Sequence, residues 1–188
     1  MKETYRQRLH NMHVILGGLE VSDRRGKSLE PQDGFQELLG LTRLARARKY
    51  TMFLVGNGAS ASMASHIAAD LCKNAKLSTE VFSDASLLTA VANDVGSDHL
   101  FAVPLWRRGR KGDLLVAISS SGKSKNIMKA VKTARKIGMK VISFSAMNAG
   151  NPLRKTGDLN FYIRAETYGL AESSHAVLLH YWVDMVSR

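Results

Sequence analysis

The sequence has little of several residue types, and each shortage excludes a class of protein. Cys72 is the single cysteine among 188 residues, so no disulfide can form within the chain. No stretch reaches the roughly 18 consecutive apolar residues that suggest a membrane-spanning helix. No apolar signal-peptide core follows the polar residues 1–6. Together these shortages favour a cytoplasmic protein, in which we expect Cys72 to be a small core residue.

Negative charge is also scarce. Sixteen acidic residues stand against 27 lysines and arginines, which gives a formal net charge of +11. Many of the cations gather in two clusters: Arg107, Arg108, Arg110 and Lys111 before a predicted strand, and Lys125, Lys129, Lys132 and Lys136 at helical spacing. Such a surface attracts anionic small molecules or nucleic acid. Because no aromatic residue interleaves with these charges and no nucleic-acid motif occurs, we expect a small anion as ligand.

From residue 50 onward, predicted strands alternate with predicted helices. The strands are 50–55, 79–82, 113–118, 140–144 and 159–163, and the helices are 60–73, 87–92, 100–106, 124–137 and 170–186. This alternation predicts an α/β three-layer sandwich, in which helices flank a five-stranded parallel sheet on both faces. A hydrophobic content of 45% supplies enough apolar residues for its core.

Residues 1–49 are interpreted as an N-terminal helical arm preceding a domain of residues 50–188. Apolar residues at helical spacing predict one helix near residues 9–19 and another over 34–49, joined by the polar connection 24–27. A helical arm with two apolar faces suggests packing on a partner subunit.

Two loops follow buried strands, and both suit an anion. After residues 52–55 come Gly56, Asn57 and Gly58, and a helix starts near Ser60. A glycine turn between strand and helix presents backbone N–H groups to a phosphate. After strand 113–118, the run 119–124 (Ser-Ser-Ser-Gly-Lys-Ser) supplies four hydroxyls before the next helix. Ligands of parallel sheets bind at the edge where such loops lie. A serine that caps the helix is the alternative explanation of the second loop, but the occurrence of two such loops after two strands favours a phosphate site.

With these residues in view, the chain resembles the sugar isomerase (SIS) domain family. More narrowly, it resembles the sedoheptulose 7-phosphate isomerases and the related DnaA-initiator-associating proteins. The resemblance rests on residues 56–61, residues 88–94, residues 119–124 and the pair His175 and His180. It implies a five-stranded parallel α/β fold that assembles as a homotetramer with sites between subunits.

The resemblance also implies roles for individual residues. The phosphate-binding serines would be Ser60, Ser119, Ser120, Ser121 and Ser124. Further substrate-binding positions are Asn57, Gly58, Asp94 and Glu172. Asp70 and His180 fall on the catalytic positions, and His66, Asp70, Glu172 and His180 fall on the residues that hold zinc in some members. Glu172 and His180 are eight residues apart, about 12 Å along a helix. They would share one ion only by leaning together, or else they serve different subunits' sites.

Several positions depart from the family pattern. Asp70 replaces a glutamate, Glu172 a glutamine, Ala59 a glycine and Lys123 an asparagine, and Gly169 stands where an aspartate is expected. The shorter Asp70 reaches roughly 1.5 Å less far, and a 1 Å misplacement can lower catalysis about a hundredfold.

Two functions follow from these residues. The first is isomerisation of a phosphosugar such as sedoheptulose 7-phosphate through an enediol. A carboxylate and an imidazole, here Asp70 and His180, are suitable acid–base groups near neutral pH. The second is a non-catalytic SIS module that binds a sugar phosphate or a protein partner, which the change at Asp70 favours.

Overall fold

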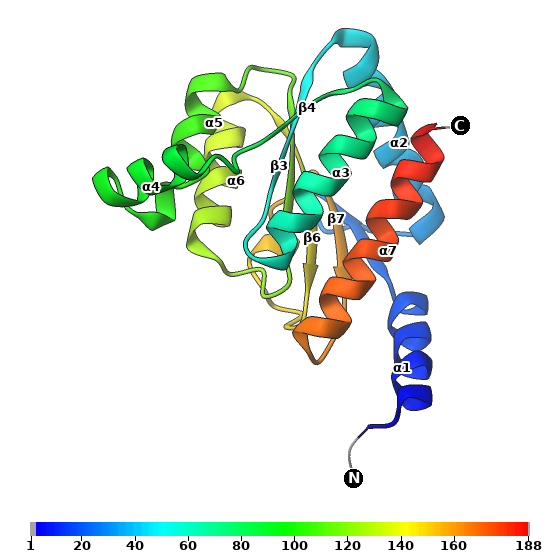
Figure 1. The fold of residues 1–188 in the computed structure, drawn as a ribbon. Helices are drawn as coiled ribbons and strands as arrows, with labels where there is room; N and C mark the ends of the chain where they lie inside the picture. Colours follow the sequence, from blue (N-terminus) through cyan, green and yellow to red (C-terminus); the bar gives the residue numbers. More distant parts are fainter. Residues whose placement is uncertain (1–2, 188) are drawn as a thin grey trace.

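A computed structural model describes residues 3–187 and contains one seven-stranded sheet in the order β2-β1-β7-β6-β5-β3-β4 (Figure 1). The strands are β1 (Glu20–Asp23), β2 (Ser28–Leu29), β3 (Thr51–Val55), β4 (Ser78–Val81), β5 (Leu114–Ser119), β6 (Lys140–Ala146) and β7 (Leu159–Ile163). Strands β3 to β7 all run parallel. The predicted five-stranded parallel sheet is therefore confirmed, and a short antiparallel hairpin extends one edge.

Helices cover both faces of the sheet, as the alternating pattern predicted. They are α1 (Tyr5–Gly17), α2 (Pro31–Arg48), α3 (Ala59–Ala75), α4 (Ala85–Asp94), α5 (Ala102–Arg108), α6 (Lys125–Ile137) and α7 (Tyr168–Ser187), with short 3₁₀ turns η1 (Ser97–His99) and η2 (Leu153–Lys155). In Figure 1, α3 and α7 lie on one side of the strands, and α5 and α6 on the other.

Two apolar clusters fill the spaces between these layers. Successive strand residues point to opposite faces, so Leu54 packs in the cluster beneath α3 and α7, and Phe53 in the cluster beneath α6. All six residues of β5 are buried, because helices cover both sides of this central strand. This layered core fixes the carboxyl edge of the parallel strands, where the two polar loops begin.

The β1–β2 hairpin was not predicted from the sequence. Residues 24–27 were interpreted as a polar connection, but they form the turn of this hairpin. The Asp23 side chain accepts hydrogen bonds from the backbone N–H groups of Arg25 and Lys27 at 2.8 and 2.9 Å. β1 then pairs antiparallel with β7. The strands are too short, and their flanks too charged, to give a clear alternation of apolar residues.

The two N-terminal helices differ in how they pack. α2 buries Phe35 and Leu38 in the cluster that also holds α7, and the indole N–H of Trp182 donates to Thr42 at 3.0 Å. α1 extends from the body of the molecule and has no buried residue (Figure 1). The domain boundary at residue 49 and the role of the arm in assembly remain predictions. Cys72 lies exposed on α3, so its predicted place in the core is wrong.

Within residues 3–187, no helix has both the length and the apolar character that crossing a membrane requires.

Candidate active site

The two polar loops meet at a cavity of about 200 Å³ at the carboxyl edge of the sheet. Its lining residues are Asn57, Ser60, Ile118, Ser119, Ser120, Ser121, Ser124, Tyr168 and Glu172. We call this space the serine cavity. It unites all five serines that the sequence singled out, together with Asn57 and Glu172.

Glycines and asparagines hold the two loops in place. A Cβ on Gly56 would lie 2.5 Å from the backbone of Ser60, so only glycine allows this close turn. The side-chain amides of Asn57 and Asn126 exchange two hydrogen bonds, at 2.9 and 2.8 Å. This pair joins the loop after β3 to the first turn of α6, and the Asn57 amide is therefore used in building the cavity.

The loop after β5 is equally constrained. Gly122 has φ +60°, and an added Cβ would lie 1.9 Å from the side-chain oxygen of Asn151. Asn151 is buried and donates to the carbonyl of Asn148 at 2.8 Å. The serine loop is thus anchored to the segment that follows β6.

Among the described residues, the cavity contains one buried hydroxyl without a protein partner and the starts of two helices without a side-chain cap. The Ser120 hydroxyl is buried and unpartnered within residues 3–187, and those of Ser119 and Ser124 lie 3.5 Å apart. No side chain caps the start of α3 or of α6, and both helices begin beside the cavity. Because buried polar groups usually find partners, these donors suit an anion that would accept from them.

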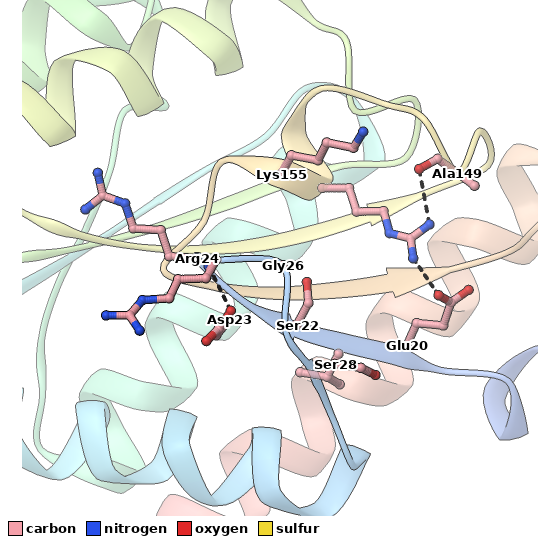
Figure 2. A pocket seen from close by; sticks show the side chains of 11 residues that line it. Glu20, Ser22, Asp23, Arg24, Gly26, Ser28, Ala149 and Lys155 are labelled. Carbon is pink, nitrogen blue, oxygen red and sulfur yellow. Dashed lines mark hydrogen bonds and ion pairs between the residues drawn. The ribbon is translucent and has the colours of Figure 1, made fainter.

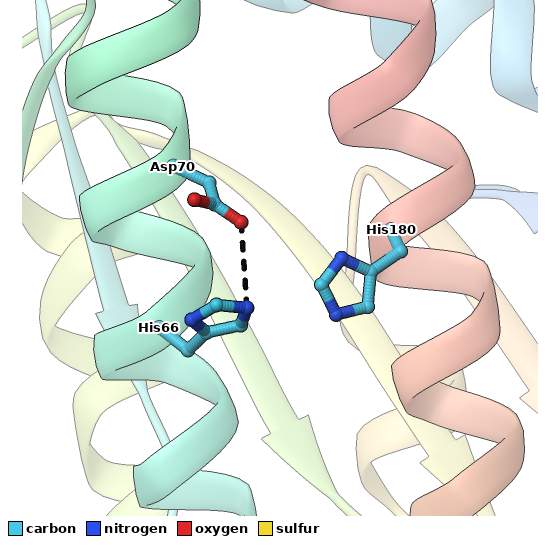
Figure 3. Close-up of side chains that lie close together, drawn as sticks. All are labelled: His66, Asp70 and His180. Carbon is cyan, nitrogen blue, oxygen red and sulfur yellow. Dashed lines mark ion pairs between the residues drawn. The ribbon is translucent and has the colours of Figure 1, made fainter.

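A second group of side chains lies on the facing sides of α3 and α7 (Figure 3). His66 Nε2 is 3.4 Å from Asp70 Oδ2, and the rings of His66 and His180 are 5.1 Å apart. One ligand atom from each of the three residues lies within 4.8 Å of the others. We call these residues the His/Asp/His triad. Together the two predicted catalytic residues and His66 form one polar cluster.

The triad and the serine cavity are separate within one chain. Asp70 follows Ser60 by ten residues of α3, a rise of about 15 Å, and His180 follows Glu172 by eight residues of α7, about 12 Å. The predicted zinc ligands are therefore divided: Glu172 lines the serine cavity, and the other three form the triad.

The triad is a possible metal site. Two imidazoles and one carboxylate are a donor set that zinc accepts, with bonds of about 2.0–2.2 Å and a fourth position open for water or substrate. In a tetrahedral site, bonds of this length place two ligand atoms about 3.3–3.6 Å apart. The present span of up to 4.8 Å would have to shorten by about an ångström, through movement of the two exposed histidines and the half-buried Asp70.

Two other predicted residues lie outside both groups. Gly58 precedes α3 with φ +55° and lines a neighbouring cavity of about 400 Å³. Asp94 ends α4, where it accepts from the Asn93 amide at 2.8 Å on an exposed surface, and it does not line the serine cavity. Its predicted role near the substrate remains a prediction.

His175, part of the motif in the last helix, is a core residue. Its side chain is fully buried, and neither ring nitrogen has a hydrogen-bond partner within residues 3–187. Burial lowers the pKa of His175 to about 4, so the ring is neutral at pH 7.

Sequence reasoning missed two residues of this region. Tyr168 lines the serine cavity at the start of α7, and Asn126 holds Asn57. The signal for Asn126 was its position two residues after Ser124, inside the first turn of a predicted helix. Tyr168 had no signal, because only the fold brings the start of α7 to this loop.

A larger cavity, about 550 Å³, lies elsewhere, between the β1–β2 hairpin and η2 (Figure 2). Its central cation, Arg154, binds Glu20 at 2.5 Å and the Ala149 carbonyl at 3.1 Å, and lies over the Tyr162 ring. These contacts engage two of the guanidinium donors and one of its faces. The cavity includes none of the residues that the sequence predicted for a site.

Known proteins are similar to this chain in sequence and in fold. The model of the SIS domain matches residues 34–146. Phosphoheptose isomerase from Helicobacter pylori strain P12 is 34% identical over 143 residues, which cover 73% of this chain and 74% of that protein. The structure of phosphoheptose isomerase from Neisseria gonorrhoeae is 30% identical, with a TM-score of 0.75 over 82% of this chain and 86% of that one.

The phosphoheptose isomerase from Francisella tularensis shares the fold with a TM-score of 0.82 over 97% of this chain and 94% of that one, at 20% identity. The predicted likeness to DnaA-initiator-associating proteins remains a prediction. The family match, the relatives and the fold agree: this chain belongs to the SIS domain family and is a phosphoheptose isomerase-like isomerase.

Proposed function

We propose that the chain is a cytoplasmic aldose–ketose isomerase of phosphorylated sugars, with sedoheptulose 7-phosphate as its substrate. The choice of a heptose phosphate as substrate rests on its relatives, which are named phosphoheptose isomerases. The observation that carries the proposal is the buried, unpartnered hydroxyl of Ser120 in a cavity with four other serines. A phosphate dianion would accept hydrogen bonds from this hydroxyl and its neighbours, and charge-assisted bonds of this kind contribute about 1.5–3 kcal/mol each.

Isomerisation moves a proton between adjacent carbons through an enediol. Asp70 is the base that takes the proton from one carbon and returns it to the next. His180 exchanges a proton with the sugar oxygens, so that neither becomes a free alkoxide. A positioned acid or base typically contributes about 10²–10⁴-fold to rate.

The distance between the two regions supports a site shared between subunits. The serine cavity would hold the phosphate, while the triad of a neighbouring subunit would supply Asp70 and His180. A homotetramer of the family's kind would bring the two together, and α1, with no buried residue, has surface free for such packing. Light scattering that finds a stable monomer at micromolar concentration would contradict this assembly.

His66, Asp70 and His180 would hold a zinc ion, and in the assembled site Glu172 of another chain would complete the predicted set. Bound zinc supplies a Lewis acid that polarises a carbonyl or hydroxyl oxygen. With zinc bound, Asp70 would be a metal ligand instead of the base. The proton transfers would then be made by other groups of the shared site.

The second candidate is a module that binds a sugar phosphate without converting it. The shorter side chain at Asp70, together with its separation from the serine cavity, favours this alternative. It keeps the serine cavity and gives the triad no catalytic role.

A coupled assay with several ketose phosphates decides between the two. Turnover of sedoheptulose 7-phosphate that disappears in Asp70→Asn supports the isomerase. A ketose phosphate that raises the melting temperature but is not converted by the wild-type protein supports the binding module. Addition of zinc, or of a chelator, to the same assay tests the metal.

A further inference from the structure

A groove on the other side of the sheet has features that sugar isomerisation does not use. Helices α5 and α6 lie side by side, and between them is a cavity of about 340 Å³. Its lining residues are His99, Ala102, Val103, Trp106, Arg107, Thr133 and Lys136. Trp106 is 56% exposed, whereas Trp182, the second tryptophan, is fully buried. An indole so exposed leaves most of its surface free for a ligand.

The groove is surrounded by cations without acidic partners. Arg107, Lys132 and Lys136 have no carboxylate within 4.0 Å in the part of the chain that the structure describes. Asp98, on the turn that contacts α6, is paired with Lys129, and Glu80 on β4 is paired with Arg108. Lys132 and Lys136 are four residues apart and share one face of α6. The surface is therefore positive on both sides of the groove.

Helix ends explain only part of this arrangement. Arg107 and Lys136 stand in the last turns of α5 and α6, where a cation interacts favourably with the helix dipole. Lys132 lies outside the last turn, and the dipole gives no reason for an exposed indole. Around the cavity beside β1, in contrast, the central Arg154 is paired with Glu20.

We propose that the α5–α6 groove binds single-stranded nucleic acid. A base would stack on the Trp106 indole, while Arg107 and Lys136 contact the adjacent phosphates. Aromatic platforms beside a positive groove bind single strands in this way, because every base offers a flat face. The sequence argues against nucleic acid, since no aromatic residue interleaves with the basic clusters. The fold places Trp106 in one groove with cations from two helices.

A second copy of this chain fits the groove less well. A symmetric contact would bring Arg107 and Lys136 of one copy close to the same residues of the other, and like charges would repel. The groove also lies apart from the serine cavity, since Lys136 is twelve residues beyond Ser124, about 18 Å along α6. The inference is thus independent of the proposed isomerase activity.

Trp106 is itself the probe for the test. Single-stranded DNA and RNA oligonucleotides of about 12 nucleotides are titrated into the full-length protein at low salt, and tryptophan emission is recorded. We expect quenching, because Trp106 is exposed and Trp182 is not. Trp106→Leu should abolish the quenching and lower the affinity, measured by anisotropy of a labelled oligonucleotide, at least about fivefold. Tyr5→Leu, which removes an exposed aromatic residue on α1, is the matched control and should bind like wild type.

The salt dependence tests the phosphate contacts. Arg107→Gln and Lys136→Gln should each reduce the slope of log affinity against log salt by about 0.7, the value for one phosphate contact of a single strand. Lys73→Gln on α3 is the control. The DNA and RNA arms show which nucleic acid is preferred. The proposal is overturned if no oligonucleotide binds at low salt. It is also overturned if Trp106→Leu binds like wild type, or if heparin, which has no bases, quenches Trp106 to the same extent.

Discussion

The serine cavity and the His/Asp/His triad both draw on α3 and α7, yet they are built differently. The cavity lies where these helices begin, enclosed by loops that leave the sheet, and its serine hydroxyls include a buried, unpartnered one. The triad lies further along the same two helices, where both histidines are exposed and Asp70 is half-buried.

This difference separates two tasks. Backbone constraints at Gly56 and Gly122 fix the cavity, so it is formed before any ligand arrives. The triad depends only on how α3 packs against α7, and two of its three side chains are exposed. In the proposed function the constrained cavity would bind the phosphate and the triad would transfer protons, and substitutions in both regions test this separation.

The largest expected effect is on the triad. Asp70→Asn keeps the shape and removes the base, so we expect turnover of sedoheptulose 7-phosphate to fall at least about a hundredfold. Phosphate affinity should stay within about twofold, because the cavity is distant. Steady-state kinetics and phosphate titration measure the two quantities. Asp70→Glu, which restores the length usual in the family, is the companion variant. If Asp70→Asn retains wild-type turnover, Asp70 is not the base.

The next expected effect is a pH dependence of stability that arises from His175. This buried residue lies on α7 between Glu172 and His180. Its pKa is lowered to about 4 by burial, from 6.5 in an unfolded chain. Between these values the unfolded chain binds the proton and the folded one does not, so stability falls as the pH drops below 6.5. The loss is about 1.4 kcal/mol per pH unit, or about 2 kcal/mol at pH 5.

Urea unfolding of wild type and His175→Leu at pH 8 and pH 5 measures this loss. Leucine cannot bind a proton, so the variant should lose about 2 kcal/mol less than wild type over that interval. Carboxylates and the other histidines are present in both proteins, so their contributions to the pH dependence of stability cancel in the difference. Equal losses in the two proteins would show that His175 is protonated in the folded state.

The third effect concerns the rigidity of the cavity. Gly122→Ala forces a positive φ on a residue with a Cβ and directs that Cβ at Asn151, so we expect a loss of about 1–3 kcal/mol in the free energy of unfolding. Phosphate affinity should fall as well. Gly40→Ala is the control: Gly40 lies exposed inside α2 with nothing near its Cβ, and alanine should stabilise that helix by up to about 1 kcal/mol. A Gly122→Ala protein as stable as wild type would mean that the loop is not constrained.

These regions also differ in how far the sequence predicted them. The parallel strands and the serine loop had strong local signals, namely apolar runs followed by glycine and serine. The β1–β2 hairpin had none, because its pairing with β7 joins residues about 140 positions apart. The approach of His66 to His180, and of Tyr168 to the serine loop, likewise depends on how helices pack. Without the family resemblance, a single sequence does not show which helices pack against each other.

The smallest expected effect is on single hydroxyls of the cavity. Ser120→Ala, Ser119→Ala and Ser124→Ala each remove one donor to the phosphate, and a charge-assisted hydrogen bond of about 1.5–3 kcal/mol corresponds to at least a tenfold rise in Kd. Ser120→Ala should do so without loss of stability, because its hydroxyl has no protein partner to leave unpaired. Ser86→Ala on the exposed α4 is the control. Calorimetric titration with inorganic phosphate and with sedoheptulose 7-phosphate measures the affinities, and if all three cavity variants bind like wild type, the phosphate lies elsewhere.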